Sequence, residues 1–151
     1  MVKPAPARKF KELLKSLNSN HVEYLLIGGY AVAVHGYIRA TNDLDIWVQI
    51  SHENANRIEK TLREFGFAAA VLTVDLFLTP NQIVRMGMPP IRIEILTSIS
   101  GVEFEECYAE CEMIQIEEDI AVPVISLARL RENKVSSGRA KDLADLENLP
   151  G

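Results

Sequence analysis

The sequence has no long hydrophobic segment and few cysteines. No apolar run approaches the ~18 residues that a membrane-spanning helix needs, and the basic N-terminus lacks the apolar centre of a secretory signal. We therefore expect a cytoplasmic protein that does not enter a membrane. The two cysteines, Cys107 and Cys111, lack further ligands at the spacing of a zinc site. Free thiols are expected instead, because disulfides are uncommon in the cytosol.

An excess of positive charge and the common nucleotide-binding motifs are also missing. The net charge of −5 argues against a protein that coats nucleic acid. Neither G-x-G-x-x-G nor G-x-x-x-x-G-K-[ST] occurs at the Gly28-Gly29 pair, which argues against a Rossmann or P-loop nucleotide binder. The length of 151 residues is enough for one domain with a real core and too small for two.

Hydrophobic periodicity predicts alternating helices and strands along this single domain, 1–151. We expect an N-terminal helix over about 5–17, a core over about 23–97, and a C-terminal hairpin and helices over about 103–149. The order of these elements predicts an α/β (α+β) fold with a mixed sheet of about four to five strands flanked by helices.

The segment 24–49 carries the strongest functional pattern. An apolar run ends at Gly28-Gly29, where the absence of side chains would let backbone N–H groups approach a phosphate. The strand that follows alternates polar and apolar residues, so Asp43 and Asp45 should share one face. Two adjacent carboxylates repel each other, and a hard cation such as Mg2+ would relieve that repulsion. The alternative is a solvated strand face with two unrelated acids.

A two-metal site commonly uses three carboxylates, and Glu94 is the best candidate for the third. It lies on the polar face of the alternating segment 91–96. The alternative is an ion pair between Glu94 and Arg92, its neighbour on the same face.

Charge is unevenly distributed towards the C-terminus. The segment 102–128 holds eight acidic residues and no lysine or arginine, whereas 129–141 holds five basic residues and one acid. Such runs are usually solvated helix faces. The more specific interpretation of the segment 129–141 is a local basic patch that binds phosphates.

Three motifs in order resemble the DNA polymerase beta-like nucleotidyltransferase superfamily, and within it the small AbiEii-type toxins and minimal nucleotidyltransferases. The first is Leu26-Ile27-Gly28-Gly29, thirteen residues, then Asp43-Leu44-Asp45-Ile46. The second is IRIEILTSISGVEFEE and the third ISLARLRENKVSSGRAKDLADLENL. The resemblance covers about residues 24–149 and implies a nucleotidyltransferase-like fold.

The resemblance also implies roles for individual residues. Asp43, Asp45 and Glu94 would be catalytic and would hold two Mg2+ ions, with Mn2+ as an alternative. The family usually has aspartate where this chain has Glu94, which changes the reach of that carboxylate. The residues expected to bind the nucleotide are Gly28, Gly29, Arg39, Thr41, Lys134, Arg139 and Lys141. Asp142 and Asp145 could equally pair with the basic ones, and His35 is expected to be a helix-packing residue.

The implied reaction moves a nucleoside monophosphate from an NTP to a hydroxyl group. The acceptor would be an RNA end such as that of tRNA, a protein or a small molecule, and a toxin–antitoxin setting would fit the relatives. The alternative function is a catalytically weak or inactive module that binds a nucleotide or a partner protein.

Overall fold

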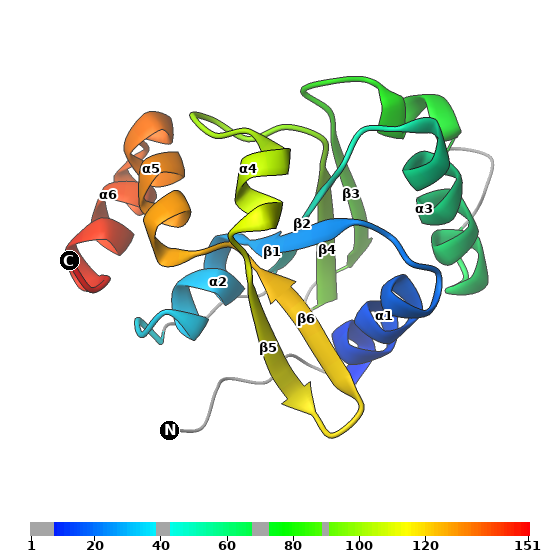
Figure 1. Cartoon of the computed structure of the whole chain (residues 1–151), viewed down its shortest axis with the longest axis horizontal. Coiled ribbons are helices and arrows are strands. Elements are labelled where there is room, and N and C mark those ends of the chain that lie inside the picture. Colours follow the sequence, from blue (N-terminus) through cyan, green and yellow to red (C-terminus); the bar gives the residue numbers. More distant parts are fainter. Residues whose placement is uncertain (1–7, 39–42, 68–72, 89–90) are drawn as a thin grey trace.

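A six-stranded mixed sheet forms the centre of the molecule (Figure 1). The structure is a computed structural model that describes residues 8–38, 43–67, 73–88 and 91–151. The strands are β1 (Tyr24–Ile27), β2 (Asp43–Val48), β3 (Ile83–Met88), β4 (Ile91–Leu96), β5 (Glu112–Glu117) and β6 (Ile120–Val124). Their order across the sheet is β3-β4-β2-β1-β6-β5. β2 runs parallel to β4 and β1 parallel to β6, while the other neighbours are antiparallel.

The mixed sheet was expected, but it has more strands than the expected four to five. The difference comes from the C-terminal hairpin of β5 and β6. Leu26 of β1 pairs with Val124 of β6, so the hairpin extends the central sheet and is not a separate element.

Seven helical segments flank the sheet in the described part of the chain. They are α1 (Arg8–Ser19), α2 (Gly28–Val34), α3 (His52–Glu64), the 3-10 helix η1 (Val74–Leu78), α4 (Phe104–Ala109), α5 (Leu127–Ser137) and α6 (Ala140–Asn148). Figure 1 shows α5 and α6 at one end of the molecule, with α1 and α3 at the other. No helix among the described residues is long and apolar enough to cross a membrane.

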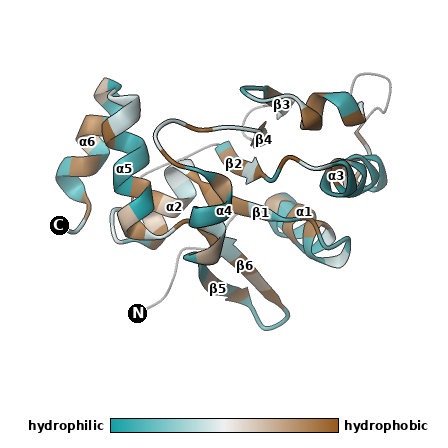
Figure 2. Ribbon diagram, turned by 45° about the horizontal axis from the view of Figure 1, so that its top comes forward, coloured by the Kyte–Doolittle hydropathy of each residue, from teal (hydrophilic) through white to brown (hydrophobic). Residues whose placement is uncertain are grey.

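Local sequence signals explain where the helices begin and which side they bury. Ser51 caps α3 and Ser126 caps α5, because each hydroxyl accepts a hydrogen bond from a backbone N–H three residues later. In α1 the buried residues Phe10, Leu13, Leu14 and Leu17 follow helical spacing. Figure 2 shows α2 and β1 as mostly hydrophobic, and α3 and α5 as mostly hydrophilic.

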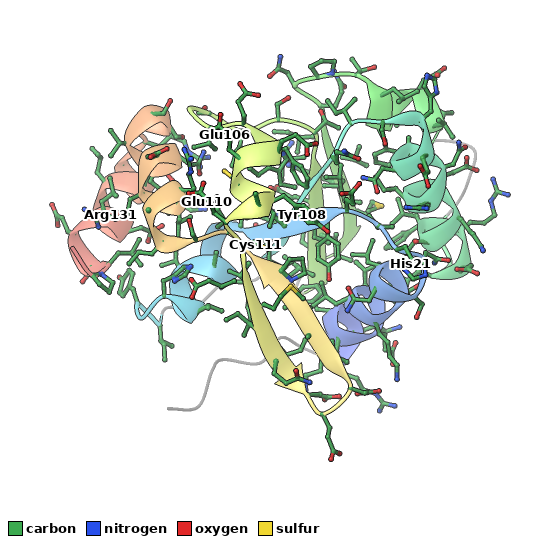
Figure 3. All side chains as sticks on the ribbon, viewed as in Figure 1. His21, Glu106, Tyr108, Glu110, Cys111 and Arg131 are labelled. Carbon is green, nitrogen blue, oxygen red and sulfur yellow. The ribbon has the colours of Figure 1, made fainter. Side chains whose placement is uncertain are left out.

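The strand β2 buries one face as its alternation predicts. Leu44, Ile46 and Val48 are almost fully buried, and Asp43 and Asp45 point to the opposite side. α4 lies over part of this second side, since Phe104 packs edge-to-face on Trp47 with ring centroids 5.1 Å apart. α4 is held to α5 by Arg129, which forms ion pairs with Glu106 and Glu110, both labelled in Figure 3.

A buried ion cluster joins α5 to α6. The Nζ atom of Lys134, whose residue is only 3% exposed, lies 3.2 Å from a carboxylate oxygen of Asp142 and 2.9 Å from one of Asp145. Burial disfavours the ionised form of Asp142. Hydrogen bonds from Arg139, Ser137 and Lys134 outweigh that cost and hold the pKa of Asp142 well below its usual range.

Replacing Lys134 with methionine should destabilise the protein by about 3–5 kcal/mol, because it leaves two buried carboxylates without their cation. Urea unfolding followed by circular dichroism measures this change. Lys141→Met removes an exposed lysine from the neighbouring helix and should cost no more than about 0.5 kcal/mol. Equal stability of the two variants would contradict the structural role of the Lys134 cluster.

Candidate active site

The pairing of β2 with β4 brings two of the expected acidic residues together. The two strands are parallel, with Asp45 opposite Glu94 and Asp43 opposite Arg92. Paired residues on neighbouring strands point to the same side of a sheet, so the three carboxylates share one face. β3 adds Arg85 on the other side of Glu94.

These carboxylates line an open cavity of about 340 Å³ at the end of the sheet that faces α5 and α6. Ser98 and Ser100, from the loop after β4, form part of its rim. Its charged and glycine lining residues are Gly28, Asp43, Asp45, Arg85, Glu94, Lys134, Arg139, Lys141 and Asp142. Four of the seven residues that the resemblance assigns to nucleotide binding line this cavity: Gly28, Lys134, Arg139 and Lys141.

Gly28 lies against the carboxylate of Asp45. Its φ of +64° is a left-handed conformation that other residues adopt at a cost. A Cβ atom placed on Gly28 would be 2.0 Å from Oδ2 of Asp45, a distance that no side chain can occupy. Gly29 is buried inside α2 and is not among the described residues that line the cavity. Of the Gly-Gly pair, Gly28 is therefore the residue that shapes the site.

Asp45 occupies an electrostatically unfavourable position. Burial, with the neighbouring carboxylates of Glu94 and Asp43, raises the pKa of Asp45 to about 7, although the positive charge of Lys141 opposes this shift. Its Oδ1 atom is buried and has no hydrogen-bond partner. An unpaired buried acceptor of this kind is costly for folding, which is characteristic of sites selected for function.

Two arginines hold the other two carboxylates. Arg85 donates a hydrogen bond from Nε to Oε1 of Glu94 over 2.8 Å, and Nε of Arg92 lies 3.8 Å from Oδ1 of Asp43. Glu94 therefore forms its ion pair with Arg85 and not with Arg92, the partner considered from the sequence. The strand register explains the exchange, since Arg85 is opposite Glu94 and Arg92 is opposite Asp43.

The donor set fits a hard divalent cation such as Mg2+, which prefers carboxylate oxygens. Asp45 offers an unpartnered oxygen, and the missing side chain of Gly28 lets its carboxylate lie directly against the backbone. Within the described segments, no three His, Cys, Asp or Glu side chains are arranged closely enough to hold a metal ion as they lie. A cation at this position would compete with Arg85 for Glu94 and with Arg92 for Asp43.

The basic residues expected to bind the nucleotide differ in how far they are already engaged in ion pairs. Lys134 lines the cavity, but it forms ion pairs with Asp142 and Asp145. For this residue the structure shows ion pairing, which was the alternative to nucleotide binding. Arg139 also pairs with Asp142, yet its side chain is 69% exposed. Lys141 is exposed, lines the cavity and acts on the charge of Asp45.

Three expected residues remain: Arg39, Thr41 and His35. Arg39 and Thr41 lie outside the described residues. His35 ends α2, where its Nε2 atom is 2.7 Å from the carbonyl oxygen of Ile125. This contact agrees with the expectation that His35 is a packing residue.

Arg85 is the main site residue that the sequence alone did not reveal. It lies on β3, which pairs antiparallel with the next strand of the chain, so that Arg85 is opposite Glu94 although the two are only nine residues apart. Asn133 and Ser137 of α5 were also missed and line the same cavity. Ile83, Arg85 and Gly87 are alternate residues of the strand and share one of its faces. This spacing was the only available sequence signal for Arg85.

Gly28→Ala should destabilise the protein more than Gly66→Ala. Both glycines have positive φ, but a Cβ atom at Gly66 meets nothing within 4 Å. Gly66→Ala should cost about 1 kcal/mol from backbone strain, and Gly28→Ala at least about 1 kcal/mol more from the collision with Asp45. Urea denaturation of both variants tests this, and equal costs would mean that the close contact with Asp45 does not constrain the site.

Asp45→Asn should stabilise the metal-free protein at pH 8 by about 1–3 kcal/mol and have little effect near pH 4. Between the ordinary aspartate pKa and about 7, the unfolded chain releases the Asp45 proton while the folded protein keeps it, so the wild type loses stability as pH rises. Thermal unfolding in EDTA at several pH values measures this difference. The exposed Asp75 provides a control, Asp75→Asn, which should show no comparable pH dependence; a pH-independent effect of Asp45→Asn would contradict the prediction.

Comparisons with known proteins agree with this arrangement. Residues 9–149 match the family described as aminoglycoside-2''-adenylyltransferase. No curated protein matches the chain. Among solved structures, a protein of Thermotoga maritima assigned as a nucleotidyltransferase is similar over 97% of this chain and 93% of its own, with 18% identity and a TM-score of 0.64.

An antigenic nucleotidyltransferase-like protein from Paracoccidioides brasiliensis is similar over 96% of this chain and 75% of its own, with 14% identity and a TM-score of 0.56. At these identities the two structures establish the nucleotidyltransferase-like fold. The family match extends over nearly the whole chain, including the three carboxylates and both C-terminal helices. The protein is thus a small nucleotidyltransferase, and its chain belongs to the aminoglycoside-2''-adenylyltransferase family.

Proposed function

We propose that the protein moves a nucleoside monophosphate, AMP in the first place, from an NTP to an acceptor hydroxyl in a Mg2+-dependent reaction. One observation carries this proposal: Asp43, Asp45 and Glu94 share a face of two adjacent strands and line one cavity with Gly28. The preference for AMP rests on the family name, since the lining of the cavity does not itself identify a base.

In the proposed reaction Asp43, Asp45 and Glu94 would hold Mg2+, or Mn2+ as an alternative. The bound cation supplies charge neutralisation at the phosphate oxygens and a lower pKa of the acceptor hydroxyl. Glu94 accepts the hydroxyl proton. The acceptor oxygen forms a bond to the α-phosphorus of the NTP while the bond to pyrophosphate breaks.

The remaining residues of the cavity bind and orient the nucleotide. Gly28 lets the backbone lie against Asp45 in the cavity wall, where a phosphate can approach it, because a Cβ atom there would collide with the carboxylate. Arg139 and Lys141 are exposed cations of the rim contributed by the C-terminal part of the chain, and they attract the triphosphate. Lys134 acts indirectly, since its pairing with Asp142 and Asp145 fixes α6 relative to α5.

The acceptor we favour is a hydroxyl of a small, positively charged molecule, as the family name indicates. The net charge of −5 suits a cationic acceptor better than RNA. An RNA end such as that of tRNA, or a partner protein in a toxin–antitoxin pair, are the other acceptors predicted from the sequence. The three candidate acceptors can be distinguished by incubating each of them with the protein, an α-labelled NTP and Mg2+. The label would move into an aminoglycoside, an RNA or a protein band.

A second candidate function is nucleotide binding without turnover. The ion pairs of Arg85 with Glu94 and of Arg92 with Asp43 favour it, because they compete with a metal ion for two of the three carboxylates. Calorimetric binding of ATP and Mg2+, without pyrophosphate release for any acceptor, would support this second function.

Asp43→Ala and Asp45→Ala should each lower Mg2+-dependent transfer by about 100-fold or more, because each removes charge stabilisation in the transition state. Pyrophosphate release measures the rate, and circular dichroism checks that both variants remain folded. Asp75→Ala, at an exposed position away from the cavity, should retain wild-type activity. Full turnover by both Asp43→Ala and Asp45→Ala would refute the proposed site.

A further inference from the structure

Glu94 carries its carboxylate on a longer side chain than the other two acids of the site. Asp43 and Asp45 are aspartates, whereas Glu94 has one more methylene group and one more rotatable bond. Holding a glutamate side chain in one conformation therefore costs more conformational entropy than holding an aspartate. A site that uses three carboxylates in defined positions needs an additional contact at Glu94, so that its carboxylate stays in place.

Arg85 supplies such a contact from the neighbouring strand. Its Nε atom donates a hydrogen bond over 2.8 Å to Oε1 of Glu94, whose side chain is 19% exposed. A hydrogen bond between two ionised groups is about twice as strong as one between neutral groups. Within the described segments, no other basic side chain forms an ion pair with Glu94. The position of the Glu94 carboxylate therefore depends on Arg85.

The pairing of the edge strand β3 with β4 holds Arg85 opposite Glu94 (Figure 1). The buried hydroxyl of Thr97 accepts a hydrogen bond over 2.9 Å from the backbone N–H of Gln82, which anchors the chain just before β3. Met86, the next residue after Arg85, is buried. A shift of one residue would turn Met86 out of the core, so the register that aligns Arg85 with Glu94 is fixed by packing.

The contact with Arg85 leaves part of Glu94 available. The hydrogen bond joins Nε to Oε1 alone, so the second oxygen of Glu94 is not bound by Arg85. Glu94 also lies close enough to Asp45 to contribute to the raised pKa of that residue. Competition between Arg85 and a cation is thus limited to Oε1. Carboxylates that ligate a metal commonly accept a hydrogen bond from a further residue, which orients them.

We propose that Arg85 is a positioning residue, which holds the carboxylate of Glu94 beside Asp45 so that a glutamate can serve as the third carboxylate of the site. The consequence for catalysis rests on the proposed nucleotidyl transfer. The consequence for cation binding does not require turnover. Removing a positioning arginine weakens cation binding, whereas removing an arginine that only competes with the cation strengthens it.

Arg85→Gln and Glu94→Asp, singly and together, form a double-mutant cycle that tests this role. The probe is Mn2+ without nucleotide, and electron paramagnetic resonance of the free ion gives the dissociation constants. Arg85→Gln should raise the dissociation constant about tenfold more in the wild-type background than in the Glu94→Asp background, because the shorter side chain depends less on Arg85. Repulsion between the charge of Arg85 and the cation is nearly equal in both backgrounds and cancels.

Two further variants control for charge. Arg85→Lys keeps a positive charge and should retain most of the affinity for Mn2+, because only one nitrogen atom of Arg85 contacts Glu94. Arg63→Gln removes an exposed arginine of α3 that pairs with Glu59, and it should bind Mn2+ like the wild type. In the transfer assay Arg85→Gln should lower kcat and leave KM for ATP unaltered, and circular dichroism checks that each variant is folded.

Three results would overturn the positioning role: no binding of Mn2+ by the wild type, equal effects of Arg85→Gln in the two backgrounds, or a larger gain of affinity in the wild-type background. These results are separate from a failure of the proposed function. Coupling between Arg85 and Glu94 in Mn2+ binding, without pyrophosphate release, would refute the transferase and support the positioning role. Transfer without such coupling would refute the positioning role and support the transferase.

Discussion

The parallel pairing of β2 with β4 is the constraint on which the site depends. It places Asp45 beside Glu94 whether or not their charges are compatible, because a shift of one residue would turn Leu44 and Ile93 out of the core. The free energy of burying those apolar side chains therefore holds two acids together against their repulsion. Gly28 completes the arrangement, because the side chain of any other residue would collide with the carboxylate of Asp45.

The local parts of this site could be predicted from the sequence, and the long-range parts could not. Alternation in the segment 43–48 was enough to place Asp43 and Asp45 on one face. Register between strands 50 residues apart is not encoded in any local pattern. For that reason the pairing of Asp43 with Arg92 was not anticipated.

The same limit explains the strand count and the role of Lys134. The hairpin of β5 and β6 was recognised from its own residues, but its attachment to β1 depends on contacts nearly 100 residues away in the chain. The basic run at 129–141 suggested a surface that binds phosphates. Only the packing of α5 on α6 shows that Lys134 is buried between two acids, while Arg139 and Lys141 remain exposed.

The ion pairs of Arg85 with Glu94 and of Arg92 with Asp43 also affect how the chain folds. Many metal-binding sites leave their ligands mutually repelling until the ion arrives, so folding has to wait for the metal. Here Arg85 and Arg92 act as internal counter-ions for Glu94 and Asp43. A newly synthesised chain can therefore complete its sheet with these two carboxylates already neutralised by its own side chains.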